Sequence, residues 1–177
     1  DKKIVLVIGG SLGAKTINES IVNCLPQLTE NNIQLVWQTG KIFFSTAESE
    51  IKKYENKGII AFDFITKMDY AYSVADVVVS RAGASSVSEL CLVKKPAILI
   101  PSPNVAEDHQ TKNAMALVTY SAAVLIKDAA ARKELAHILI ELVNDRSKCE
   151  KLEENISRLA FRDSAYAIAN EVIRLAN

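Results

Sequence analysis

Residues 75–103 constrain the fold of this chain more than any other stretch, because they read as strand, glycine turn, helix and strand in immediate succession. The apolar run 77–79 ends at a turn over 80–85, and a second apolar run at 98–100 returns as the next strand. The helix between them has an apolar face formed by Val87, Leu90, Cys91 and Val93. This β-α-β unit predicts two parallel strands joined by a right-handed crossover.

The same alternation of strands and helices runs through the whole chain and predicts one doubly wound, parallel α/β sheet of about six strands. The expected strands are 4–8, 35–38, 59–62, 77–79, 98–100 and 123–126. The expected helices are 14–25 (ended by Pro26), 44–54, 68–75, 86–93 and 109–120, with further helices from Ala129 onward, the last at 164–175. With 177 residues, the chain is expected to form a single domain, 1–177.

The start of the central helix points to an anion site. A helix that begins just past the carboxyl end of a strand directs free N–H groups and the positive end of its dipole into the crevice where such sheets bind ligands. Glu89, one turn inside this helix, can accept hydrogen bonds from a ribose diol. Ser86 and Glu89 also fit a capping box, in which the carboxylate would instead bind the N–H of Ser86. The small residues 83–86 leave room for a ligand and favour a nucleotide-sugar site, whereas Arg81 can pair with either a phosphate or a carboxylate.

Composition excludes several other kinds of site. The 21 basic and 21 acidic side chains balance, so no broad field attracts nucleic acid and any anion site must be local. The three cysteines share no CxxC spacing, which favours a reducing cytosol. His109 and His137 are the only histidines and lie in no His/Cys cluster, so we expect no metal. We expect no transmembrane segment, since no apolar run approaches ~20 residues, and no signal peptide precedes the first strand.

The glycine turn at 9–13 allows three interpretations. GGSLGAKT is one residue short of a Walker A loop, because Ala14 replaces the last glycine before Lys15, so a P-loop nucleotide-binding module remains an alternative. Ser11 takes the position of the second glycine of a dinucleotide fingerprint, so that motif is absent. The glycines can also serve only a tight strand-to-helix turn. Both glycine-bearing turns follow strands, so they are expected at the same edge of the sheet.

His109 and Gln110 open a helix after a proline-bearing loop at the same sheet edge. Their side chains can either meet sugar hydroxyls there or remain a solvated surface pair. A thiol nucleophile pairing Cys91 with His109 is disfavoured, because Cys91 lies in the apolar stripe of its helix.

Five blocks together carry a family resemblance. They are GGSLGA after the first strand, WQTGK after the second, FI with Met68 after it, SRAGASSVSEL, and PAILIPSPNVAEDHQTKNA. With these blocks the chain resembles the C-terminal half of the bacterial N-acetylglucosaminyltransferases that complete the lipid-linked precursor of peptidoglycan, the MurG family. The resemblance implies a GT-B enzyme built from two Rossmann-like halves, of which this chain would be the half that binds the donor, UDP-N-acetylglucosamine.

The resemblance also implies roles for individual residues. Ile65 would hydrogen-bond uracil through its backbone, Glu89 would take the ribose hydroxyls, and Arg81 would help to neutralise charge. Gln110, with His109 beside it, would contact hydroxyls of the sugar. The diphosphate would be held by Ser11, Gly83, Ala84, Ser85, Ser86, Val87 and Ser88. UDP-N-acetylglucosamine is a substrate, and neither a cofactor nor a metal is expected.

The implied reaction inverts the anomeric carbon and transfers the sugar to a lipid-linked acceptor. The acceptor-binding half and the catalytic base have no counterpart in these 177 residues, so no catalytic residue is expected here and the chain alone should transfer nothing. A natural split subunit is an alternative to a fragment. Thr66 and Lys67 stand where the family has more acidic residues. The full-length protein would be a peripheral protein at the cytoplasmic face of the plasma membrane.

Overall fold

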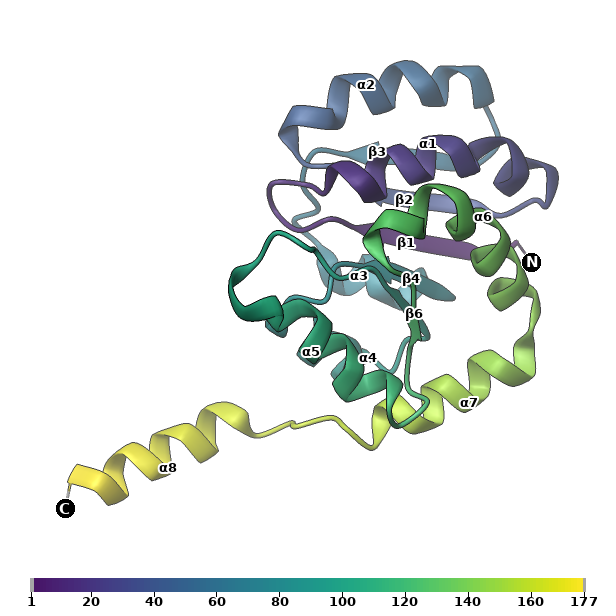
Figure 1. Cartoon of the computed structure of the whole chain (residues 1–177). Coiled ribbons are helices and arrows are strands. Elements are labelled where there is room, and N and C mark those ends of the chain that lie inside the picture. Colours follow the sequence, from purple (N-terminus) through teal and green to yellow (C-terminus); the bar gives the residue numbers. More distant parts are fainter. Residues whose placement is uncertain (1, 177) are drawn as a thin grey trace.

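The computed structural model describes residues 2–176, and within them a six-stranded, all-parallel sheet forms the centre of the molecule (Figure 1). Its strand order is β3-β2-β1-β4-β5-β6, which confirms the predicted doubly wound fold. The strands are β1 (Ile4–Ile8), β2 (Gln34–Gln38), β3 (Ile59–Phe62), β4 (Val77–Ser80), β5 (Ala97–Leu99) and β6 (Val124–Leu125). Because all strands are parallel, the turns that follow them meet at one carboxyl edge.

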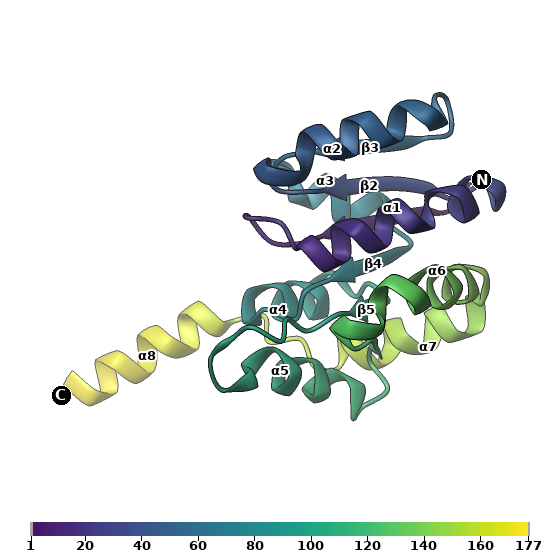
Figure 2. The same ribbon diagram turned by 45° about the horizontal axis from the view of Figure 1, so that its top comes forward.

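Helices cover both faces of this sheet, as two views of the ribbon show (Figures 1 and 2). The helices are α1 (Lys15–Glu30), α2 (Lys41–Ile51), α3 (Met68–Val74), α4 (Ala84–Val93), α5 (His109–Val118), α6 (Asp128–Asn144), α7 (Arg146–Ser157) and α8 (Ser164–Ala176). Short 3₁₀ turns, Lys52–Tyr54 and Ala106–Asp108, follow α2 and precede α5. Helices α1, α2 and α6 pack on one face, and α3, α4 and α5 pack on the other.

Two hydrophobic cores explain why the strands are continuously apolar. Val5 and Val7 of β1 point into the core shared with α1 and α6, whereas Leu6 and Ile8 point into the core shared with α3, α4 and α5. Successive side chains of a strand alternate between faces, so a strand buried on both sides needs an unbroken apolar run. Helix α7 closes one end of the molecule, with Ile156 in the second of these cores.

Several helix boundaries differ from the sequence-based prediction. Helix α1 does not end at Pro26 but continues to Glu30, because the ring of Pro26 lies on the exposed side while Leu25 and Leu28 stay fully buried. The burial of these leucines offsets the hydrogen bond that a proline cannot donate. Helix α2 begins at Lys41, directly after Gly40, and its predicted last turn is 3₁₀. Strand β6 and helix α5 are each shorter than predicted.

Helix α8 projects from the rest of the molecule in both views (Figures 1 and 2). None of its residues is buried, although it carries large apolar side chains at Tyr166, Ile168, Val172, Ile173 and Leu175. Across residues 2–176, none of the helices combines the length and the apolar character that a membrane crossing requires.

We expect a chain that ends at Arg162, and so lacks α8, to keep its free energy of unfolding within about 0.5 kcal/mol of the original value. The reason is that α8 buries no side chain. Denaturant titration checks this, with Ile156→Ala as the control: Ile156 is fully buried, and its truncation should cost about 2–5 kcal/mol. A truncation as costly as Ile156→Ala would show that α8 packs on the domain in solution.

Candidate functional site

A polar cavity of about 410 Å³ lies at the carboxyl edge of the sheet. Its wall is built from the turn after β1, the end of β4, the loop after β5 and the first residue of α6. The lining residues are Gly9, Gly13, Ala14, Lys15, Thr16, Arg81, Ser102, Pro103, Asn104, Gln110 and Asp128. The structure therefore brings the first glycine turn, Arg81 and Gln110 together around one space, whereas the other predicted site residues, Ser11, Ile65, His109 and 83–89, do not line it.

The glycine turn after β1 packs tightly against the turn after β2. Gly13 has a positive φ of 78° and donates a backbone hydrogen bond to the carbonyl of Gly10 (3.1 Å). A Cβ at Gly13 would stand 2.1 Å from the carbonyl oxygen of Thr39. The two backbones thus approach so closely that only glycine fits. Ser11 is exposed in this turn and is not among the residues that line the cavity.

The structure gives the P-loop interpretation no support. Lys15, the lysine of the near-Walker sequence, has a side chain that is 83% exposed and lies 3.9 Å from Glu19. The hydroxyl of Thr16 donates to the carboxylate of Asp128 (3.0 Å). In a P-loop, this lysine and this hydroxyl instead serve the nucleotide phosphates and a magnesium ion.

Arg81 lies in the cavity wall and is paired there. Its Nη1 donates to Asp128 Oδ1 (2.5 Å) and to the backbone carbonyls of Ile100 (3.0 Å) and Pro101 (3.1 Å). Of the two partners that the sequence allowed for Arg81, the structure thus shows a carboxylate. Sequence reasoning missed Asp128 as that partner, although the residue directly precedes the helix predicted from Ala129 and is the first residue of α6.

The N-terminus of α4 is open, and the capping box that the sequence also allowed does not form. The helix starts at Ala84 after Gly83, two residues before Ser86, and no side chain caps it. Its first backbone hydrogen bond runs from the N–H of Val87 to the carbonyl of Gly83 (2.9 Å). The N–H groups of residues 84–86 precede this bond and so point out of the helix end. The free N–H groups of this helix N-terminus thus belong to residues 84–86, within the segment 83–88 predicted to hold the diphosphate.

Glu89 is exposed on the first turns of α4 and is held from outside the helix. Its Oε2 accepts a hydrogen bond from the hydroxyl of Tyr72 in α3 (3.0 Å). The ring of Tyr72 is buried, at 5% exposure. Burial, followed by the neighbouring Glu89 carboxylate, raises the pKa of the Tyr72 phenol well above its usual range. This bond fixes the carboxylate of Glu89 without using its second oxygen.

The pKa shift of Tyr72 predicts a loss of stability at high pH. Above about pH 10, the usual phenol pKa, the unfolded chain ionises Tyr72 while the folded chain does not, so folding stability falls as pH rises, by up to about 1.4 kcal/mol per pH unit. The Tyr72→Phe variant has no phenol to ionise at this position, so it lacks this loss of folding stability above pH 10. The difference in unfolding free energy between the two proteins should therefore shrink steadily above pH 10 in paired denaturant titrations; a constant difference would contradict the assignment.

Ile65 is held by a residue that the sequence did not single out. The backbone N–H of Ile65 donates to Gln38 Oε1 (2.9 Å), and Gln38 Nε2 donates to the carbonyl of Gly10 (3.1 Å). Through these two bonds, Gln38, which is 2% exposed, joins the glycine turn to the loop before α3. Because the N–H of Ile65 is occupied, its carbonyl is the backbone group that remains for a base. A polar residue at the end of a buried strand was the available signal.

His109 and Gln110, predicted to act together at the start of α5, lie in different surroundings. Gln110 lines the cavity, where its Oε1 accepts from the backbone N–H of Ser102 (2.9 Å). His109 is exposed, and its Nδ1 lies 2.9 Å from the carbonyl oxygen of Ala106. Glu107 and Asp108 before it both have positive φ (52° and 51°), which turns the chain sharply into α5. Within residues 2–176, no group of three or more His, Cys, Asp or Glu is placed to hold a metal.

The strand order, the open helix end and the polar cavity together define a Rossmann-like domain of the class that binds nucleotides at the carboxyl edge of its sheet. Residues 4–171 match the glycosyltransferase family 28 C-terminal domain, and the chain belongs to this family.

Named relatives make this placement more specific. UDP-N-acetylglucosamine--N-acetylmuramyl-(pentapeptide) pyrophosphoryl-undecaprenol N-acetylglucosamine transferase of Parabacteroides distasonis is 51% identical over 175 residues, which are 99% of this chain and 48% of that protein. The protein of the same name from Porphyromonas gingivalis W83 is also 51% identical, over 99% of this chain and 46% of that protein. The crystal structure of Acinetobacter baumannii MurG superposes with a TM-score of 0.89 at 27% identity, covering 98% of this chain and 50% of that one. The chain spans about half the length of the curated relatives it matches.

Proposed function

We propose that this chain is the donor-binding half of an enzyme that transfers N-acetylglucosamine from UDP-N-acetylglucosamine to a lipid-linked muramyl-pentapeptide acceptor. The observation that carries the proposal is the open N-terminus of α4, which lies at the carboxyl edge of the sheet with Glu89 one turn further on. A diphosphate suits the first part of this arrangement and a ribose diol suits the second. The names of the relatives supply the sugar, the nucleotide and the acceptor.

Within this proposal each part of the site has one role. The N–H groups at the start of α4, with the hydroxyls of Ser85, Ser86 and Ser88, receive the diphosphate, and Ser11 approaches it from the first turn. Glu89 accepts the ribose hydroxyls. The carbonyl of Ile65 accepts from the base. Arg81, two residues before Gly83, and Gln110 line the cavity, where Arg81 would help to neutralise the diphosphate and Gln110 would contact the sugar. His109 would contact the sugar from its exposed position outside that lining.

The chemistry follows from charge that develops on the leaving group. As an acceptor hydroxyl attacks the anomeric carbon with inversion, the bond to UDP breaks and negative charge grows on the diphosphate. Preorganised N–H groups and a helix dipole stabilise that charge without reorganising. In this proposal, the residues that bind the acceptor and the base that removes the proton of its hydroxyl belong to a part of the protein beyond these residues. Because the acceptor is lipid-linked, the full-length protein would act at the membrane surface, as a peripheral enzyme on the cytoplasmic face.

Calorimetric titration of the chain tests the proposal. We expect saturable binding of UDP-N-acetylglucosamine and of UDP, and weaker binding of uridine, because the nucleoside lacks the diphosphate that the α4 N-terminus would receive. ATP with Mg²⁺ is the control ligand. A folded chain that gives no heat with UDP-N-acetylglucosamine would contradict the proposal. Mg²⁺-dependent binding of ATP that is lost in Lys15→Ala would favour the P-loop alternative.

A further inference from the structure

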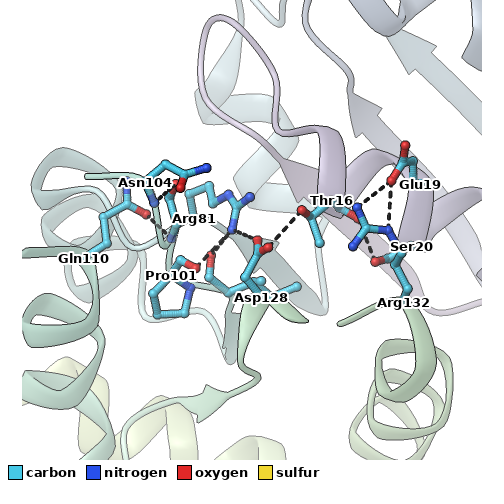
Figure 3. Close-up of polar contacts among 11 residues, drawn as sticks. Thr16, Glu19, Ser20, Arg81, Pro101, Asn104, Gln110, Asp128 and Arg132 are labelled. Atoms are coloured by element: carbon cyan, nitrogen blue, oxygen red, sulfur yellow. Dashed lines mark hydrogen bonds and ion pairs between the residues drawn. The ribbon is translucent and has the colours of Figure 1, made fainter. Parts of the chain in front are cut away.

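Asp128, the first residue of α6, connects the first turn of helix α1 with the residue that follows β4, and both line the cavity (Figure 3). Its Oδ2 accepts from the hydroxyl of Thr16, the second residue of α1, and its Oδ1 accepts from Nη1 of Arg81, which follows β4. The side chains of Asp128 and Arg81 are 16% and 13% exposed. The two oxygens of one carboxylate therefore bind a hydroxyl of helix α1 and a guanidinium at the end of β4, and the ion pair is largely shielded from solvent.

This pairing fixes one side of the guanidinium of Arg81. Nη1 has three acceptors: Asp128 and the carbonyls of Ile100 and Pro101. Figure 3 shows the two other guanidinium nitrogens pointing away from Asp128, on the side of Asn104. Arg81, Asn104 and Gln110 all line the cavity. A planar guanidinium anchored by one nitrogen presents its remaining N–H donors in a fixed direction, which is the geometry that favours binding to phosphate oxygens.

We propose that Asp128 is a positioning residue of the donor site, which orients Arg81 so that its free N–H donors meet the diphosphate of the nucleotide sugar. The inference rests on the proposed function and adds to it a residue that does not itself touch the ligand phosphate. Asp128 acts by holding Nη1, so that the guanidinium does not have to be ordered when the ligand arrives. Pre-ordering of this kind raises affinity because the entropy cost of fixing the side chain falls outside the binding step.

Electrostatics alone predicts that the site binds an anion more tightly when Asp128 loses its charge, whereas a positioning role predicts weaker binding. The direction of the change in affinity therefore tests the inference. Removing the negative charge of Asp128 would strengthen the attraction of the site for an anion. In Figure 3, however, the carboxylate lies on the side of Arg81 opposite the free nitrogens. Without Asp128, Nη1 keeps only two neutral carbonyl acceptors, and the guanidinium can rotate away from the cavity. We therefore expect the loss of orientation to outweigh the gain in charge.

The first experiment compares UDP with uridine. Asp128→Asn is expected to weaken UDP binding about tenfold, the scale of a hydrogen bond to a charged group, and to leave uridine binding unchanged. Thr16→Val, which removes the other partner of Asp128, should weaken UDP binding by less than about threefold, the scale of a neutral hydrogen bond. Glu19→Gln is the matched control: Glu19 pairs with Arg132 between the same two helices but does not line the cavity, so no effect on UDP binding is expected.

A double-mutant cycle shows whether Asp128 acts through Arg81. In an Arg81→Gln background, Asp128→Asn should cost no further affinity for UDP, because nothing remains to be positioned. Additive effects, tighter UDP binding by Asp128→Asn, an equal loss with uridine, or an equal loss in Thr16→Val would each overturn the inference. Should Asp128→Asn fail to fold, Arg81→Gln alone must still reduce the affinity for UDP but not for uridine. If the unsubstituted chain does not bind UDP, the proposed function fails and the inference fails with it.

Discussion

Replacing Gly13 by alanine is expected to destabilise the domain by about 3 kcal/mol or more, because two separate costs add at this residue. Its φ of 78° lies in the left-handed region, which a side chain makes unfavourable. The new Cβ would also stand 2.1 Å from the carbonyl oxygen of Thr39, a backbone atom that cannot turn aside as a side chain would. Denaturant titration should show a lower midpoint at an unchanged slope.

Gly10→Ala is the matched control for this prediction. Gly10 belongs to the same turn and has a φ of 84°, but a Cβ there would have no heavy atom within 4 Å. Only the conformational cost applies, about 1 kcal/mol. The difference between the two variants therefore measures the contact between the turns after β1 and β2. Equal losses in both would mean that this contact yields more easily than the structure indicates.

Glu89→Gln is expected to weaken UDP binding by roughly 10- to 100-fold, the range of a charge-assisted hydrogen bond. In the proposed complex, the carboxylate accepts from both ribose hydroxyls, whereas an amide offers a single acceptor oxygen. The glutamine keeps the length of the side chain, so packing against Tyr72 is preserved. Calorimetric titration with UDP gives the affinity directly.

The ligand supplies the control for Glu89. A UDP analogue without the ribose hydroxyls should bind the original chain weakly and the Glu89→Gln variant equally weakly, because the interaction is absent in both complexes. Glu134→Gln, at an exposed glutamate of α6, should bind UDP like the original chain. If Glu89→Gln weakened the binding of both nucleotides to the same extent, Glu89 would have a role other than ribose recognition.

The sequence was sufficient for the features that depend on local patterns. Strands β1 and β3 have the predicted bounds, and β2, β4 and β5 differ by one residue at one or both ends. Buried parallel strands reveal themselves as short apolar runs, and the polar or glycine-bearing turns after them must lie at one edge of the sheet. For this reason the sequence predicted that the first glycine turn, Arg81 and Gln110 lie at the same edge of the sheet, where the structure shows them around one cavity.

The contacts between distant side chains could not be predicted in this way. Arg81 and Asp128 are 47 positions apart, and Gln38 and Ile65 are 27 apart, so no local pattern connects them. The capping box does not form because α4 begins at Ala84, two residues earlier than the box requires, and the partner that Glu89 does have, Tyr72, is 17 positions away. Likewise, Pro26 stops an isolated helix, but here the buried face of α1 continues past it.

The strand order has a consequence for the way in which the chain acquires its fold during synthesis. Strand β1 lies in the middle of the sheet, where it pairs with β2 on one side and β4 on the other. The β1–β2–β3 half can assemble from neighbouring segments, but the other edge of β1 stays unpaired until β4 has been synthesised. An apolar strand with an unpaired edge can form hydrogen bonds with another chain instead. The nascent domain is thus most vulnerable to misassociation between the emergence of β3 and that of β4.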